Sequence, residues 1–110
     1  MSSLLYYDNS EAVDANGYVQ VDRIYCLKLD QFTDADWALL ADCYGRLPGW
    51  SGTGEHGFPC WFGSSESAPY LIVSAEPSGL QVFGAVQPND LRRWHDAFFD
   101  VCSKLPHLED

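Results

Sequence analysis

Residues 70–86 read YLIVSAEPSGLQVFGAV, two apolar runs separated by the turn residues Pro77, Ser78 and Gly79. Runs of Val, Ile, Leu, Tyr and Phe bounded in this way are typical of a β-hairpin. Proline suits the second position of a type I turn, and glycine can take the left-handed conformation that closes a tight connection. We therefore predict antiparallel strands over residues 70–76 and 80–86.

Two helices are predicted, one before this hairpin and one after it. The first covers residues 34–44, with Thr33 as its N-cap, and its apolar stripe consists of Trp37, Leu40, Ala41 and Tyr44. The second covers residues 90–105, with Asn89 as its N-cap, and its stripe consists of Leu91, Trp94, Phe98, Val101, Cys102 and Leu105. Each stripe predicts packing against a sheet, so Trp37 and Trp94 are both expected in the core.

Three further strands are predicted over residues 4–7, 19–29 and 58–62. Pro59 lacks a backbone N–H, which places the last of them at an edge of the sheet. The expected fold class is α+β, with a mostly antiparallel sheet of four to five strands, two helices packed on one face, and the order β-β-α-β-β-β-α. Residues 1–110 are expected to form a single compact acidic domain.

The charge of the chain limits its partners. Sixteen Asp and Glu residues against six Lys and Arg residues give a formal net charge of −10. Such a field repels phosphate backbones and anionic membranes, so we expect no nucleic acid and no membrane as partner, and instead a basic protein.

The four cysteines, Cys26, Cys43, Cys60 and Cys102, include no C-x-x-C pair. The first residues, MSSLLYYDNSE, show no basic region followed by an apolar stretch of the kind found in signal peptides. We therefore expect a cytoplasmic protein with reduced thiols, with no cofactor and no bound metal.

Residues 44–63 read YGRLPGWSGTGEHGFPCWFG and combine six glycines with two tryptophans and two phenylalanines. Loops that offer large aromatic side chains among carboxylates suit partners with basic surfaces, because the charge speeds association and the aromatic groups slow dissociation. The hypothesis is an inhibitor or immunity-type protein that masks a basic partner such as a toxin or nuclease. The expected partner-binding residues are Trp50, Glu55, His56, Trp61 and Glu66.

Two other functions are compatible with the sequence. His56 and Cys60 in the glycine-rich segment are the residue types of a small enzyme or ligand-binding domain. The predicted order α, β, β, β, α after residue 33 also matches that of double-stranded RNA-binding domains, although the acidity of the chain argues against RNA.

The second helix carries polar residues that need partners. Arg92 and Arg93 lie in its first turns, where the helix dipole disfavours cations. Each is expected to pair with a carboxylate such as Asp90 or Asp96, with a ligand as the alternative. His95 borders the apolar stripe and is expected to be a partly buried packing residue that forms a hydrogen bond at one ring nitrogen.

Overall fold

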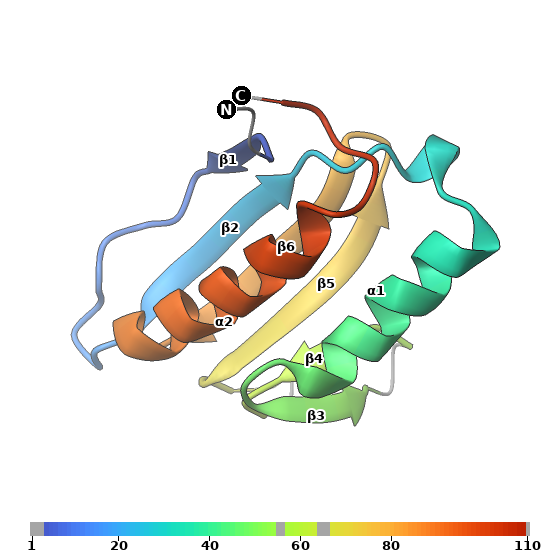
Figure 1. Cartoon of the computed structure of the whole chain (residues 1–110). Coiled ribbons are helices and arrows are strands. Elements are labelled where there is room, and N and C mark those ends of the chain that lie inside the picture. Colours follow the sequence, from blue (N-terminus) through green and yellow to red (C-terminus); the bar gives the residue numbers. More distant parts are fainter. Residues whose placement is uncertain (1–3, 55–56, 64–66, 110) are drawn as a thin grey trace.

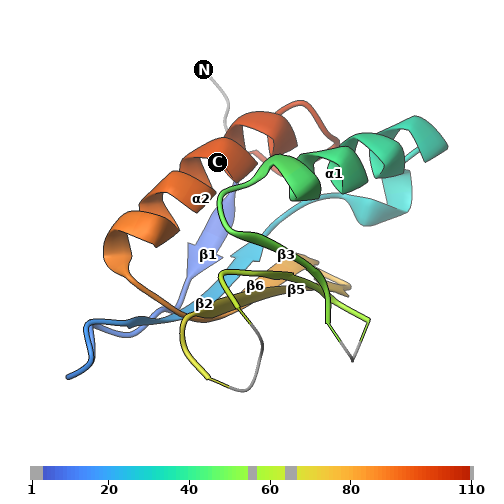
Figure 2. The same cartoon turned by 90° about the horizontal axis from the view of Figure 1, so that it is seen from below.

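The computed structural model describes residues 4–54, 57–63 and 67–109. Within them, six strands form one sheet in the order β1-β2-β6-β5-β4-β3, with every neighbouring pair antiparallel. The strands are β1 (Tyr6–Asp8), β2 (Val19–Tyr25), β3 (Trp50–Thr53), β4 (Pro59–Trp61), β5 (Tyr70–Glu76) and β6 (Gly79–Val86). The helices α1 (Asp34–Arg46) and α2 (Pro88–Cys102) lie side by side on one face of the sheet (Figures 1 and 2). The predicted α+β class is confirmed.

The central hairpin is confirmed, with Glu76 paired to Gly79 across its turn. Gly79 also lies beside the neighbouring strand β2, where a Cβ atom would clash with the backbone oxygen of Tyr25. Glycine at this position therefore allows β6 to start directly next to the end of β2.

The predicted strand count and element order are wrong at residues 50–53. These residues form β3, so four strands separate the two helices and the order is β-β-α-β-β-β-β-α. β3 is the edge strand, whereas β4 pairs on both sides and Pro59 is its first residue, a position that needs no backbone donor. Gly52, with a φ of 87°, lies at a register irregularity that breaks the alternation of a regular strand. The α, β, β, β, α order of RNA-binding domains is therefore not matched.

The strands near the N-terminus are shorter than predicted or shifted. β2 ends at Tyr25, which pairs with Leu80, and only Gly79 of β6 lies beyond that pair. The chain then forms an isolated bridge between Leu27 and His107 and a 3₁₀ turn, η1 (Leu29–Gln31). β1 begins at Tyr6, and Leu4 forms an isolated bridge with Glu109.

The cap of α1 is confirmed, and that of α2 is wrong. Thr33 Oγ1 accepts a hydrogen bond from Asp36 N, and Asp36 Oδ2 accepts one from Thr33 N, which completes a capping box. α2 begins two residues earlier than predicted, with Gln87 at the N-cap position and Pro88 at the first helical position, where the fixed φ of proline is favourable.

The core lies between the helices and the sheet. α2 contributes four buried side chains, Leu91, Trp94, Phe98 and Cys102, which confirms the prediction for Trp94. The prediction for Trp37 is wrong: its ring packs on Phe32 with centroids 4.9 Å apart and remains largely exposed. All four cysteines are buried and free of disulfide bonds.

Candidate functional site

The two tryptophans of residues 44–63 face each other across the β3–β4 pair but differ in exposure. Trp50 and Trp61 are register partners with ring centroids 5.3 Å apart. Trp61 is fully buried, and its Nε1–H donates a hydrogen bond to the backbone oxygen of Tyr44 over 3.1 Å. Trp61 is therefore not accessible to a partner in this structure, and its ring packs against that of Trp50.

The remaining predicted partner-binding residues, Glu55, His56 and Glu66, lie outside the described residues. Between β3 and β4, Gly54 N donates a hydrogen bond to Phe58 O over 3.0 Å. Cys60, the candidate nucleophile beside His56, is buried in β4, and its Sγ donates to Phe58 O over 3.4 Å. Among residues 4–54, 57–63 and 67–109, no group of His, Cys, Asp and Glu side chains could hold a metal ion.

A groove of about 270 Å³ lies between α1 and the strands beneath it. Its lining is predominantly apolar and consists of Trp37, Leu40, Ala41, Tyr44, Phe58, Pro59, Val73, Ala75 and Leu80. Trp37 and Phe58 are 43% and 41% exposed, and Trp50 on the neighbouring edge strand is 40% exposed. We call these three residues the aromatic rim. The glycine-rich pattern predicts Trp50 as a partner-binding residue. The helical stripe, by contrast, predicts a core position for Trp37.

The helix beside this groove carries mainly acidic charge. Asp34 and Asp36 lie in its first turn, and Asp42 forms an ion pair with Arg46 over 3.0 Å. Asp34 and Asp42 are exposed, while no charged side chain among the described residues lines the groove itself. The site thus offers apolar surface next to carboxylates.

A polar cluster lies on the other half of the sheet, between β1, β2 and α2. Arg23 Nη2 contacts Asp8 Oδ2 at 3.1 Å, and Arg23 Nη1 lies 3.4 Å from Tyr25 Oη and 3.3 Å from His95 Nδ1. Tyr25 Oη lies 2.8 Å from the same His95 nitrogen. The ring of Tyr6 completes the cluster, with its centroid 5.7 Å from the guanidinium carbon of Arg23. The prediction of a partly buried His95 bonded at one ring nitrogen is confirmed.

Burial and charge shift the ionisation of this cluster. Burial, followed by the positive charge of Arg23, lowers the pKa of His95 below its ordinary value. Burial raises the pKa of the Tyr25 hydroxyl, so this phenol remains protonated. Burial opposes ionisation of Asp8, but hydrogen bonds from Arg23 and Ser10 outweigh it and lower the pKa of this carboxyl. The cluster therefore contains a neutral imidazole beside a guanidinium–carboxylate pair at neutral pH.

No protein-family model, curated protein or solved structure matches the chain. Over the described residues, neither α1 nor α2 combines the length and the apolar composition that crossing a membrane requires.

Proposed function

We propose that the protein is an acidic protein-binding domain of the inhibitor or immunity type, which masks a basic partner such as a toxin or a nuclease. The observation that carries the proposal is the aromatic rim: Trp37 and Phe58 line an apolar groove, and Trp50 is exposed on the edge strand β3. Large aromatic side chains at the centre of an interface supply most of the binding energy in many complexes. A partner that covers the rim would bury this surface.

Charge supports a basic partner. The net charge of −10 attracts cationic proteins over distances comparable to the Debye length, about 8 Å at physiological salt. The residues of the groove that the structure describes are uncharged, whereas Asp34 and Asp42 are exposed on the adjacent helix. The complementary partner segment presents an apolar side chain to the groove and Lys or Arg residues to α1.

The test is capture of a partner from an extract of the organism that makes the protein, using wild-type protein and matched variants. Trp37→Ala and Trp50→Ala each remove one member of the aromatic rim. Tyr7→Ala is the control, because Tyr7 is a 56% exposed aromatic residue on β1, at the opposite edge of the sheet. Mass spectrometry identifies the captured proteins, and calorimetry with the purified candidate gives stoichiometry and affinity.

We expect a one-to-one complex with a basic protein whose activity is inhibited. Trp37→Ala and Trp50→Ala should weaken it at least about tenfold, and Tyr7→Ala should change it less than about twofold. Association should slow when salt rises from about 0.05 to 0.5 M, because screening shortens the range of attraction. Thermal melting of each variant excludes loss of folding as the cause. The proposal fails if no captured protein distinguishes the rim variants from Tyr7→Ala.

A further inference from the structure

A second cavity, of about 240 Å³, lies between β2 and the first half of α2. Its lining consists of Val19, Arg23, Pro88, Leu91, Arg92 and His95. β2 lies next to the edge strand β1, whereas the aromatic rim lies at the β3 edge, so the two sites occupy opposite halves of the sheet. Two of the four arginines of an acidic chain therefore meet in one cavity.

The hydrogen bonds of His95 determine which of its nitrogens carries the proton. His95 Nδ1 lies 3.3 Å from Arg23 Nη1 and 2.8 Å from the hydroxyl of Tyr25. A guanidinium can only donate hydrogen bonds, so Nδ1 is the acceptor and the proton of the neutral ring is on Nε2. His95 therefore contributes an N–H donor to the residues that line the cavity.

Arg23 adds positive charge to the lining of the cavity, and one of its donors has no acceptor. Its Nη2 is bound to Asp8, and its Nη1 is bound within the Tyr25–His95 pair. Its Nε is buried and has no hydrogen-bond partner among the described residues. Buried donors are rarely left unpaired in folded proteins, because their hydration is lost without replacement.

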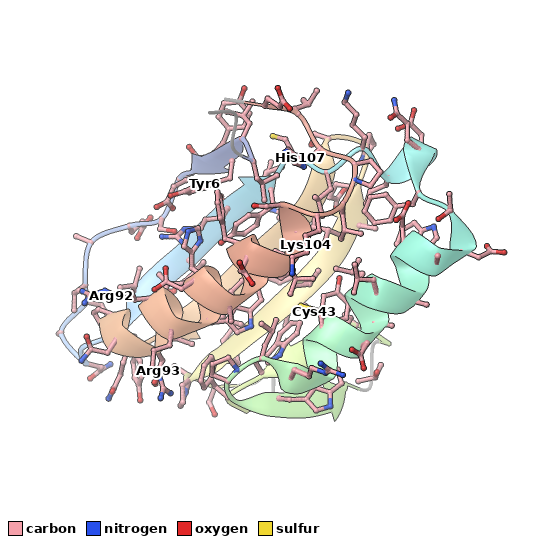
Figure 3. All side chains as sticks on the ribbon, in the orientation of Figure 1. Tyr6, Cys43, Arg92, Arg93, Lys104 and His107 are labelled. Atoms are coloured by element: carbon pink, nitrogen blue, oxygen red, sulfur yellow. The ribbon has the colours of Figure 1, made fainter. Side chains whose placement is uncertain are left out.

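Arg92 supplies the third donor. Its neighbour Arg93 forms the expected ion pair with Asp90 over 3.2 Å, but Arg92 has no ion pair with a carboxylate anywhere in the described part of the chain. Both arginines lie at the beginning of α2, where the helix dipole disfavours a cation that lacks a counter-charge (Figure 3). No carboxylate lines the cavity among these residues, so all of its charged groups are hydrogen-bond donors.

We propose that this cavity binds a small oxyanion, a phosphate or a carboxylate, held by Arg23, Arg92 and His95. Two guanidinium groups and one imidazole N–H match the several acceptor oxygens of such an anion. With about 30 Å³ per water molecule as a scale, the volume corresponds to about eight water molecules, which is enough for a phosphate or a small carboxylate. The proposal does not depend on the protein-binding function of the other half of the sheet.

The test is titration of the full chain with inorganic phosphate, and separately with acetate, against sodium chloride at equal ionic strength. NMR of the His95 ring and thermal melting report binding. Arg92→Ala removes an exposed donor of the cavity, and Arg93→Ala is the matched control because it removes the same charge one residue away, outside the cavity lining. Circular dichroism of both variants establishes that they fold.

We expect at least one of the two anions to shift the His95 ring signals and to raise the melting temperature of the wild type and of Arg93→Ala equally. Arg92→Ala should bind that anion about tenfold more weakly, or not at all. Preference for phosphate would indicate a tetrahedral ligand, and preference for acetate a planar one. Equal affinity of Arg92→Ala and Arg93→Ala for the anion would overturn the proposal. So would the absence of any response of the wild type to either anion at about 50 mM, a concentration far above the dissociation constant expected of a preformed site.

Discussion

The two helices lie on the same face of the sheet, but they bury very different surfaces. α2 buries Trp94, Phe98 and two further side chains of its apolar stripe, whereas α1 buries only Leu40 and Cys43. Trp37 and Leu39 of α1 are exposed. The contrast indicates that the α2 half of the molecule holds the fold together, and that the α1 half keeps apolar surface accessible.

The sheet beneath each helix explains the difference. The strands β2 and β6 have seven and eight residues, whereas β3 and β4 have four and three. The shorter strands bring fewer side chains to this side of the sheet, and an apolar groove that reaches Val73 and Ala75 of β5 stays open beside α1. A second groove of about 220 Å³, lined by residues that include Leu39, Cys43 and Val101, separates α1 from α2 (Figure 3). α1 is therefore bordered by grooves on two sides.

The largest expected effect on the free energy of unfolding comes from replacing one tryptophan by alanine in each half. Trp94 is fully buried, with ring centroids 4.7 Å from Phe98 and 5.2 Å from Trp61. Trp94→Ala should lower the free energy of unfolding by about 3 to 5 kcal/mol, because it removes core contacts and leaves a cavity. Trp37→Ala should cost at most about 1 kcal/mol, because 43% of its surface is already exposed and it lies outside the buried core. Urea unfolding followed by circular dichroism measures both.

A milder change at the same position sharpens this comparison. Trp94 Nε1 is buried without a hydrogen-bond partner among the described residues. Trp94→Phe keeps most of the apolar ring and removes this unpaired donor, so it should cost less than about 2 kcal/mol. If Trp37→Ala proved as destabilising as Trp94→Ala, the division into a structural half and an accessible half would be wrong.

The next effect is a dependence on pH that arises in the α2 half alone. Burial and the charge of Arg23 lower the pKa of His95, although Asp96 and Asp8 act in the opposite direction. Its value in the unfolded chain is about 6.5, so the unfolded state binds the proton more readily. The stabilising contribution of neutral His95 is complete above about pH 6.5 and is lost as pH falls through the lower folded pKa, at no more than about 1.4 kcal/mol per pH unit.

Urea unfolding of wild type and His95→Gln between about pH 7 and pH 5 tests this contribution. The difference between the two curves isolates His95 from the other two histidines of the chain. The carboxyl of Asp8 does not interfere, because hydrogen bonds from Arg23 and Ser10 lower its pKa in the folded protein and it stays ionised over this range of pH. Parallel curves would show that the protonation of His95 is not linked to folding.

Sequence patterns predict the α2 half better than the α1 half, for a physical reason. The 70–86 hairpin and the α2 stripe are regular, and their periods follow from burial along a long, continuous surface. β3 is short, contains Gly52 and has a register irregularity, so its residues show no alternation to detect. Trp37 has the spacing of a core residue, but spacing does not reveal that its ring packs on Phe32 at the side of an open groove.

The sequence predicts the candidate sites only in part. Trp50 can be singled out in the sequence because no apolar periodicity accounts for an aromatic residue among these glycines. In the structure it is exposed as part of the aromatic rim. The joint position of Arg23 and Arg92 in one cavity depends on the crossing of β2 and α2, which are far apart in the chain. The sequence also does not reveal that Arg92 lacks an ion pair among the described residues, because Asp96 lies four residues away, at a spacing that predicts one.

The smallest expected effect concerns the last turn of α1. Gly45 is exposed, and a Cβ atom built there meets no atom within 4 Å. Gly45→Ala should stabilise α1 by about 0.5 to 1 kcal/mol, because alanine loses less backbone entropy in a helix. Because α1 buries little surface, it should open locally before the whole molecule unfolds, so its amide hydrogens should exchange about two- to fivefold more slowly in the variant. Global unfolding also opens α1, so amides of α2 that exchange only through global unfolding should slow by the same factor. The discriminating measurement is therefore the exchange free energy of each helix: faster exchange of α1 than of α2 in both proteins would establish that α1 opens on its own, and equal exchange free energies would show that the two halves unfold as one.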